Sequence, residues 1–600
     1  MSAAARPHRE DRGSALLLAI FFLVLLFLLA SAFLALVPSE LHAAQRHLND
    51  TSAFYAADAG VVDTIEWLEQ EVEAGTLDSH FSMGSGNPFV RSGTLDNWEW
   101  EVEIHPDSLT FGSTSALVPN PLHIYRLEVT ASLWERDYCR VEAWVTQASF
   151  ADKAYFVDRM PTNLWLNLAT LDIEGDYHTN GTLMMSVPGG FYNQPTDPPF
   201  KGKVTFAEKT DHPTLGFVDG ARYNSWTNLP YDAQAVPIDG RYEKLVAGGR
   251  SRMVYASEPI EMPPNSGVIA TAAWGSTAPP PGSVTQGEFA LPIHSPSGSP
   301  NPVKVRVNPS ATGGPYPTLE NGIYVEGNLQ QMRLEVNNNN SRVRLKQSNQ
   351  EVWVTLVTNT LTIPAGRKVN GIVETTPIVL QGKDVNPSSP NYTVLEDRKN
   401  GEFLVYEKTT NGTIFCTGDI LGLSGVNKGR RTIATLTDTG PSSNLDREIF
   451  IDGSITRTDT TPGQTPTSAD DMLGLISYAV RISGTTTPAR SATNATNPLW
   501  FYASIFTGRD GDTSSSMVTG GGFGVEGYQS GAPGYMKVYG SIAEGFRQAK
   551  GTFNPSTGAT VTGMAYEYHY EPMLKKVQPP FWPALPGFRM LTWYEESIYR

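Results

Sequence analysis

The chain has 600 residues, more than one domain usually holds, so at least two domains are expected. Only 18% of the residues are charged, while glycine (55) and proline (43) are abundant, which is typical of loop-rich β structure outside the cell rather than of a helical enzyme. The net charge of −16 argues against nucleic acid as a main partner, because a phosphate-binding surface must be basic.

The first predicted element is an apolar helix behind a short charged leader, residues 1–13. Residues 15–37 are apolar except for Ser31, and a helix of that length is about 34 Å long, enough to cross a hydrocarbon core of about 30 Å. The leader carries three arginines and two acidic residues, which favours a cytoplasmic amino terminus. A secretory signal cleaved after residues 30–32 is the alternative, although such signals have shorter apolar regions.

Helical periodicity continues beyond Pro38, where we expect a kink. Apolar residues recur at seven-residue intervals and predict a stripe that packs on the following domain. The stripe consists of Leu41, Leu48, Tyr55 and Val62, widened by Ala44, Ala59, Ile65 and Leu68. We therefore expect one helix over residues 14–74, with 14–37 as its transmembrane or polymerisation part.

An antiparallel sheet is predicted to follow the helix. Residues 97–105, "NWEWEVEIH", alternate strictly between apolar and charged side chains, as in a half-buried strand. Residues 122–134 and 138–147 read as a hairpin joined by a short polar turn. A long helix followed by a three-stranded meander is an α+β domain, and we place it at residues 38–150.

Two stretches of the helix resemble PilX-like type IV minor pilins. "RGSALLLAIFFLVLLFLLASA" is similar to a class III leader, which implies that prepilin peptidase cleaves between Gly13 and Ser14 and that the new amino terminus is methylated. "AFYAADAG" resembles the "AF-AAEAG" signature of the family, with Asp58 in place of glutamate. The resemblance implies a pilin-like fold and gives Phe54, Tyr55, Asp58 and Gly60, along with Pro38, a role in the assembly helix.

Leu18 departs from the pattern of major pilins. It occupies the fifth mature position, where a pilin carries a glutamate that pairs with the terminal amine of a neighbouring subunit. A buried amine without a partner is costly, so a subunit that lacks this carboxylate fits poorly inside a shaft and better at a tip. The simpler alternative is that Leu18 is a membrane residue of a permanently anchored protein.

Residues 151–320 and 321–600 are predicted to be mainly β. The first segment contains many loops rich in Pro, Gly and Ser, including 276–283, "STAPPPGS". From 321 onward, "NGIYVEGNL", "NGTIFCTGDI", "REIFIDGSI" and "MKVYGSI" share a loose repeat. Short strands with Gly or Asn at corners, including "NNNN" at 337–340, favour a parallel β-solenoid with a Pro- and aromatic-rich carboxyl-terminal cap. A β-sandwich is the alternative.

The order of several stretches also resembles the large domain that follows PilX-like helices in some bacterial proteins. They include "FKGKVTF", "GRRTIATL", "DMLGLIS", "VYGSIAEGFRQAKG" and the closing "YHYEPMLKKVQPPFWPALPGFRMLTWYEE". The resemblance implies an uncharacterised extracytoplasmic domain and supplies no catalytic residue.

No residue is assigned a catalytic, cofactor or metal role from the sequence. His178 with Asp176 could form an acid/base pair, but a turn histidine with satisfied hydrogen bonds is the more common arrangement. The loop at 509–516 lacks the remaining ligands of a calcium site. The acidic residues of the repeat, Glu326, Asp419 and Asp452, could stack on successive coils as a catalytic set, but a solvated ladder is the default. The cysteines Cys139 and Cys416 could pair in an exported protein, but their surroundings indicate different domains, and we expect two buried free thiols.

The main functional hypothesis is a non-enzymatic minor subunit of a type IV pilus or of a type II secretion-like pseudopilus. It would be a single-pass inner-membrane protein with a cytoplasmic amino terminus before assembly, and would lie at a pilus tip or the cell surface afterwards. Its expected partners are prepilin peptidase, other minor and major pilins, and a surface or polysaccharide ligand. The alternative is a membrane-anchored or secreted β-solenoid enzyme that acts on polysaccharide, which exposed aromatic residues beside paired carboxylates would favour.

Overall fold

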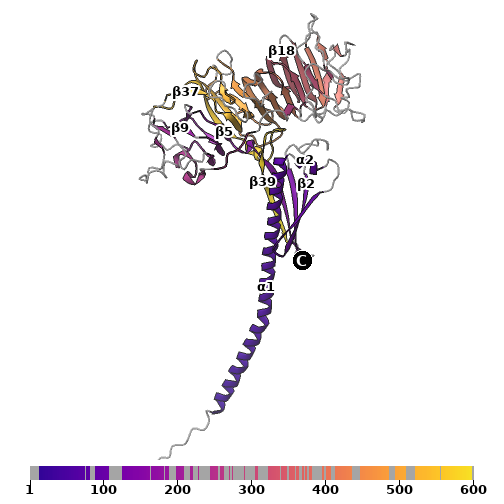
Figure 1. Ribbon diagram of the computed structural model, residues 1–600, viewed down its shortest axis with the longest axis vertical. Coiled ribbons are helices and arrows are strands. Elements are labelled where there is room, and N and C mark those ends of the chain that lie inside the picture. Colours follow the sequence, from indigo (N-terminus) through magenta and orange to yellow (C-terminus); the bar gives the residue numbers. More distant parts are fainter. Residues whose placement is uncertain are drawn as a thin grey trace, which may run out of the picture. The chain divides into compact units, whose positions relative to one another are not determined.

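The computed structural model (Figure 1) forms two compact units. Unit 1 comprises Met1–Asp107, Ile124–Thr146 and Phe588–Arg600, and unit 2 comprises Ser108–His123 and Gln147–Gly587. The described residues are 12–74, 76–81, 88–106, 124–134, 136–161, 164–181, 183–187, 197–207, 216–219, 227–228, 243–254, 257–262, 269–270, 273, 289–290, 304–307, 322–337, 339–347, 350–357, 360–363, 368–369, 372–373, 378–381, 395–397, 400–406, 412–435, 446–484, 493–508, 520–554 and 556–597.

Unit 1 begins with α1, a helix of 63 residues over Arg12–Ala74. The helix predicted for residues 14–74 is therefore present. It passes through Pro38 without interruption, and the ribbon shows a gentle curve (Figure 1). Two serines donate their hydroxyl hydrogen to carbonyl oxygens one turn earlier, Ser31 to Phe27 and Ser39 to Leu36, both at 2.7 Å, so α1 satisfies these polar groups internally. A short helix, α2 (Leu77–His80), follows.

A five-stranded sheet with the order β1-β2-β3-β4-β39 forms the rest of unit 1. Its strands are β1 (Phe89–Leu95), β2 (Trp98–Pro106), β3 (Ile124–Leu133), β4 (Arg136–Ser149) and β39 (Ala584–Ser597). Neighbours from β1 to β4 pair antiparallel. The predicted strand at 97–105 and the predicted hairpin correspond to β2, β3 and β4. The sequence analysis assigned neither β1 nor β39 to this sheet, and β39 comes from the far end of the chain.

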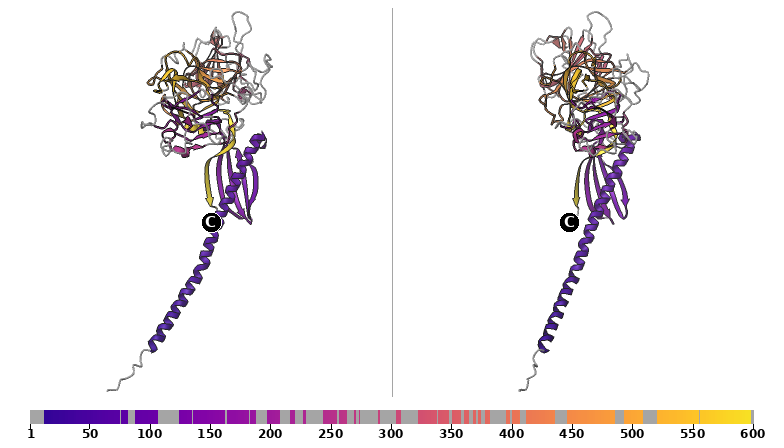
Figure 2. Two further views of the ribbon diagram at one scale, coloured as in Figure 1. Left: turned by 60° about the vertical axis from the view of Figure 1, so that its left-hand side comes forward. Right: turned by 90° about the vertical axis from the view of Figure 1, so that its left-hand side faces the viewer.

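One face of this sheet carries the core of unit 1. Burial alternates along β2, where Trp98, Trp100, Val102 and Ile104 are buried and the intervening side chains are exposed or half-buried. The helix α1 lies against this buried face (Figure 2). The apolar face of the strand therefore packs on the helix, as period-2 alternation requires.

Unit 2 is built on two large sheets. The 12-stranded sheet contains, in spatial order, β13 (Met253–Val254), β10 (Val204–Phe206), β8 (Tyr177–Thr179), β5 (Tyr155–Arg159), β36 (Ile542–Phe546), β33 (Ser504–Thr507), β30 (Met472–Ser477), β28 (Arg430–Thr435), β26 (Thr413–Cys416), β16 (Ile323–Glu326), β15 (Lys304–Val307) and β14 (Phe289–Ala290).

The 16-stranded sheet has a main path and three strands off it. The path is β22 (Ile372–Val373), β21 (Lys368–Val369), β24 (Leu395–Asp397), β25 (Asn400–Tyr406), β19 (Gln350–Val357), β18 (Asn340–Gln347), β17 (Gln331–Asn337), β27 (Ile420–Asn427), β29 (Glu448–Arg457), β32 (Leu499–Tyr502), β35 (Gly534–Gly540), β38 (Thr560–Tyr570) and β37 (Gly551–Phe553). Strands β31 (Ala479–Ile482), β34 (Phe523–Val525) and β7 (Ile173–Glu174) join it at the side.

Smaller elements also occur in the described part of unit 2. A four-stranded sheet contains β12 (Thr227–Asn228), β11 (Gly216–Asp219), β9 (Met184–Val187) and β6 (Leu166–Asn167), and β20 (Thr360–Ile363) pairs with β23 (Ile378–Gln381). Single turns of 3₁₀-helix lie at Phe150–Asp152, Gly249–Arg252 and Pro572–Lys575.

Between β26 and β36 the strands of unit 2 pass back and forth between the two large sheets and pair in parallel, whereas β17, β18 and β19 follow one another in the 16-stranded sheet and pair antiparallel. From β26 to β30 the chain visits the 12-stranded and the 16-stranded sheet in turn, and β33 and β36 return to the first after strands in the second. Every neighbouring pair from β16 to β13 in the 12-stranded sheet is parallel. Strands β5, β8, β10 and β13, which precede residue 320, extend the same sheet as the later strands.

The two cysteines are buried free thiols, as expected, and they belong to different units. Burial raises the pKa of Cys139 to about 11 and that of Cys416 to about 12. The Cys416 thiol donates to the carbonyl oxygen of Gly327 at 3.2 Å. The stretches 276–283 and 509–516, with Asp510 and Asp512, and one of the four asparagines at 337–340 lie outside the described residues.

Candidate functional site

The amino-terminal half of α1 is an apolar helix whose side chains are exposed. Every described side chain from Leu16 to Leu48 is exposed. Leu18, which has no carboxylate to offer at the fifth position of the expected mature chain, is 60% exposed. The backbone of Gly13 and Ser14 lies in the first turn of α1, and their side chains are outside the described part. By length and composition α1 could cross a membrane. So large an apolar surface needs lipid or other helices around it.

The carboxyl-terminal half packs on the sheet, but not through the predicted stripe. Leu41, Leu48, Tyr55 and Val62, which recur every seven residues, are all more than half exposed. The predicted stripe is therefore wrong for its four principal members. Of the residues predicted to widen the stripe, Leu68 is buried, as expected, and Ile65 is half-buried. The other buried positions are Ala53, Ala56, Ala57, Gly60, Val61 and Thr64.

Small side chains occupy these positions because the helix lies close to the sheet. A Cβ atom placed on Gly60 would lie 3.1 Å from both the Trp100 ring and the Val129 side chain, closer than ordinary van der Waals contact. The three buried alanines extend the same close contact over a further turn. The segment "AFYAADAG" therefore packs α1 against the sheet. The pattern in the sequence that indicates this contact is the run of small residues, not the seven-residue repeat of large ones.

The other residues of this segment divide between packing and exposure. The ring of Phe54 lies 6.0 Å from that of Trp593 on β39, in an edge-to-face arrangement. The Tyr55 side chain is exposed, and Asp58 is half-buried. The backbone nitrogen of Phe588 donates to Oε1 of Glu69 at 2.9 Å, so β39 contacts α1 at a second place.

The candidate catalytic residues do not form a site. The His178 ring is buried, stacks on Phe156 with an interplanar angle of 1°, and bonds Thr205 through Nδ1 (2.7 Å) and Asn180 through Nε2 (3.0 Å). Burial lowers the pKa of His178 to about 4, so the ring is neutral near pH 7. Asp176 accepts a hydrogen bond from the backbone nitrogen of Lys203 at 2.9 Å. Both side chains are therefore satisfied within the fold.

The acidic residues of the loose repeat contact different neighbours. Oδ1 of Asp419 accepts from the backbone nitrogen of Glu448 at 3.0 Å, whereas Oδ2 of Asp452 accepts from Nε2 of Gln331 at 3.1 Å. These contacts hold backbone and side chains of adjacent strands together. The two carboxylates do not converge on one point, as catalytic carboxylates that act on one substrate must.

A charged ladder on β7, β35 and β38 is a group that sequence reasoning missed. His569 bonds Glu174 through Nδ1 (3.1 Å) and Glu567 through Nε2 (3.2 Å), and Nζ of Lys537 lies 2.7 Å from Glu567. The bond from His569 lowers the pKa of Glu174, while burial raises the pKa of Asp172 close by. The register of three parallel strands creates this group, so no local sequence pattern could have indicated it.

The sequence matches no protein-family model and no curated protein. Among solved structures, the chain is similar to the crystal structure of the competence-associated pilin ComZ from Thermus thermophilus. The identity is 11% and the TM-score is 0.26, over 92% of this chain and 98% of that chain. A TM-score this low carries no argument about the fold. The fold of unit 1 is therefore described from α1 and its sheet alone.

Proposed function

We propose that the protein is a non-enzymatic, pilin-like minor subunit. In this proposal residues 14–37 hold the subunit in the inner membrane, prepilin peptidase cleaves after Gly13, and the subunit joins a type IV pilus or a type II secretion-like pseudopilus. Unit 2 is then displayed outside the cell for adhesion or partner contact. The resemblance of the helix to PilX-like minor pilins points in the same direction.

One observation carries this proposal: α1 is continuous, yet only its second half has a protein partner within unit 1. A helix exposed and apolar over residues 16–37 must be covered by lipid or by other helices, because water would otherwise contact 17 large apolar side chains, each worth about 1.5–3 kcal/mol of burial. The packed second half holds the sheet at a fixed place on the helix. Such a helix serves first as a membrane anchor and later as a packing element.

Between β26 and β36 the chain passes back and forth between the two large sheets, and neighbouring strands of this part pair in parallel, which supports reading it as a β-solenoid rather than a sandwich. In a sandwich the sheets are usually antiparallel, whereas stacked coils place each strand parallel to its predecessor in the same sheet. A solenoid offers a long side surface for contact with a partner or polysaccharide. Its size makes dense repetition along a shaft unfavourable, and Leu18 lacks the carboxylate that would recruit a neighbour. We therefore place the subunit at a tip or in an initiating complex.

Immunogold labelling of sheared fibres with an antibody against unit 2 tests this placement. Label at one end of the fibres, at low copy number, is the expected result. A matched Leu18→Glu variant supplies the missing carboxylate and is expected to move label into the shaft. Label spread evenly along wild-type fibres, or no association with fibres, would contradict the proposed role.

The enzymatic alternative can be tested at one group. Asp172 and Glu174 are two residues apart, so period-2 alternation places them on one face, and His569 lies 3.1 Å from Glu174. Burial raises the pKa of Asp172 while the bond from His569 lowers that of Glu174. If this pair acts on polysaccharide, purified protein will release reducing ends and Asp172→Asn will abolish the release. The matched control is Asp470→Asn, which changes an exposed acidic residue elsewhere in unit 2. No release by the wild type would exclude this alternative for the polysaccharides tested.

A further inference from the structure

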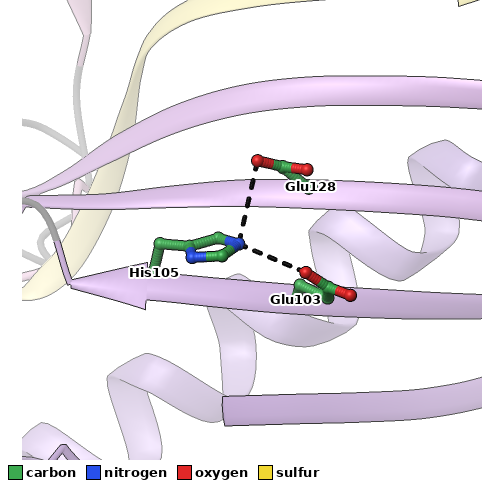
Figure 3. A group of neighbouring side chains, drawn as sticks. All are labelled: Glu103, His105 and Glu128. Atoms are coloured by element: carbon green, nitrogen blue, oxygen red, sulfur yellow. Dashed lines mark ion pairs between the residues drawn. The ribbon is translucent and has the colours of Figure 1, made fainter. Parts of the chain in front are cut away.

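The outer face of the unit 1 sheet, opposite α1, carries a cluster of a histidine and two glutamates. On β2 the buried Val102 and Ile104 face the helix, so Glu103 and His105 lie on the other face. Glu128 on β3 is directly opposite Glu103 in the antiparallel register. Figure 3 shows the imidazole of His105 between the two carboxylates.

The glutamates form a row of like charges across three strands. Glu103 is opposite Glu128, and Glu128 is opposite Glu142 on β4. Like charges in directly opposite positions destabilise a sheet. Nη1 of Arg126 lies 2.6 Å from Glu128 and 4.0 Å from Glu142, so one arginine faces two of the carboxylates. The row as a whole therefore attracts a further cation.

The geometry of His105 points to a metal ion as that cation. Its Nε2 atom is shielded from solvent and has no hydrogen-bond partner among the described residues. It lies 3.4 Å from Oε2 of Glu103 and 3.7 Å from Oε1 of Glu128, and the three atoms all lie within 4.8 Å of one another. Ligand atoms about 2.1 Å from a tetrahedral ion are about 3.4 Å apart, close to the separations of Nε2 from each of the two carboxylate oxygens.

A second histidine between two glutamates shows what an ordinary ion-pair arrangement looks like. His569 presents Nδ1 to Glu174 at 3.1 Å and Nε2 to Glu567 at 3.2 Å. Each ring nitrogen therefore bonds a different carboxylate, and no single point is shared by three ligand atoms. In the outer cluster, by contrast, one nitrogen and two carboxylates converge.

We propose that Glu103, His105 and Glu128 bind one divalent transition-metal ion of the Zn²⁺ class. One imidazole and two carboxylates suit Zn²⁺ better than Ca²⁺ or Mg²⁺, which prefer oxygen ligands alone, and water would complete the coordination. The ion neutralises the glutamate row and ties β2 to β3. This site is independent of the proposed role in a pilus or pseudopilus.

Zinc binding by the full-length protein in detergent, after removal of metal with a chelator, tests the site. We expect the wild type to bind zinc saturably and to melt at a higher temperature when zinc is present. His105→Ala is expected to bind one equivalent less and to lose the zinc-dependent rise. Glu103→Gln and Glu128→Gln, which keep the shape of the side chain, are expected to weaken binding even if His105→Ala folds poorly.

His569→Ala is the matched control, because it removes a histidine that also contacts two glutamates. We expect it to keep the full zinc stoichiometry and the zinc-dependent rise in melting temperature. The proposal is overturned if the wild type binds no zinc, or if His105→Ala and both glutamine variants bind zinc as the wild type does. It is also overturned if His569→Ala alone loses the bound ion.

Discussion

Leu48 and Leu68 lie on the same helix, but Leu48 is 59% exposed and Leu68 is fully buried. The difference extends to the two halves of α1. Large apolar side chains cover the first half without a partner in unit 1, while alanines and a glycine are among the buried residues of the second half. Burial along this helix therefore follows the position of the sheet rather than the hydrophobicity of the side chain. The first half must find its apolar surroundings outside the unit.

The largest effect is expected from removing the strand that returns to unit 1. A chain ending at Gly587 loses the Phe54–Trp593 contact and the bond between Phe588 and Glu69, and it uncovers the edge of β4. We expect amide protection in α1 residues 53–68 and in β1–β4 to be largely lost in hydrogen exchange. A chain ending at Ser597, the last residue of β39, is the control and should keep it. Unchanged protection in the shorter chain would show that the first four strands suffice.

The next largest effect is expected from shortening Leu68, with the same change at Leu48 as its control. Leu68→Ala should lower the free energy of unfolding of unit 1 by about 2–5 kcal/mol, because it leaves a cavity between helix and sheet. Leu48→Ala should change it by less than about 0.5 kcal/mol, because that side chain has no packed neighbours to lose. Denaturant unfolding in detergent, followed by tryptophan fluorescence, measures both. Equal effects would mean that helix and sheet are not packed as described.

A smaller loss is expected at Gly60. Gly60→Val adds side-chain atoms where even a Cβ would be 3.1 Å from Trp100 and Val129, so overpacking should cost about 1–3 kcal/mol. Ala59→Val, which places the same side chain at the neighbouring half-buried position, is the control. Because valine has a better helix propensity than glycine but a worse one than alanine, propensity alone would make Gly60→Val the more stable of the two. The same unfolding measurement applies. A Gly60→Val variant as stable as its control would argue against close approach at this point.

Tyr55 should have the smallest effect on the subunit itself. Its side chain is 59% exposed, so Tyr55→Ala should leave the unfolding free energy of unit 1 within about 0.5 kcal/mol of the wild type. Tyr55 belongs with Leu41, Leu48 and Val62 to the exposed apolar residues that recur every seven positions. If these residues contact other subunits in the fibre, Tyr55→Ala should reduce recovery of the subunit with fibres. A large loss of subunit stability would place Tyr55 in the core instead.

The sequence predicts the helix well because its composition and length have few alternative structures. Its buried face was mispredicted because a seven-residue pattern of large side chains was given more weight than the run of alanines and glycine at 53–60. Close approach of a helix to a sheet selects small residues, and this signal was present in the sequence. The local sequence of β39 does not show that this strand joins the unit 1 sheet, because it pairs there with β4, more than 400 residues earlier in the chain.

The strands of unit 2 were partly predictable, but their arrangement was not. The loose repeat marks β16, β26, β29 and β35, yet the first two lie in the 12-stranded sheet and the others in the 16-stranded sheet. The repeated motif therefore does not mark one equivalent position in successive coils.

A buried charged group in unit 2 also contradicts the usual expectation that charged residues are exposed. Glu544 and Lys550 are buried, with Nζ of Lys550 3.0 Å from Oε1 of Glu544, and burial lowers the pKa of Lys550 to about 7. The segment "GSIAEGFRQAKG" gives no sign of this, because pairing partners decide whether a charge can be buried.

The outer cluster of unit 1 was missed for a similar reason. Glu103 and His105 are visible as neighbours on one face of a strand, but Glu128 joins them only through the antiparallel register of β2 with β3. The spacing of ligand residues along the chain therefore predicts no metal site here.

The amino-terminal residue of the mature protein tests the central claim most directly. Intact-mass and terminal sequencing should be done on protein isolated from cells that contain prepilin peptidase. The proposal requires a chain that begins at Ser14 with a methylated amine, because the exposed apolar half of α1 would then serve both the membrane and the assembly. A chain that begins at Phe33 would identify a secretory signal, and an intact Met1 would identify a permanent anchor. Either result would contradict a processed pilin-like subunit.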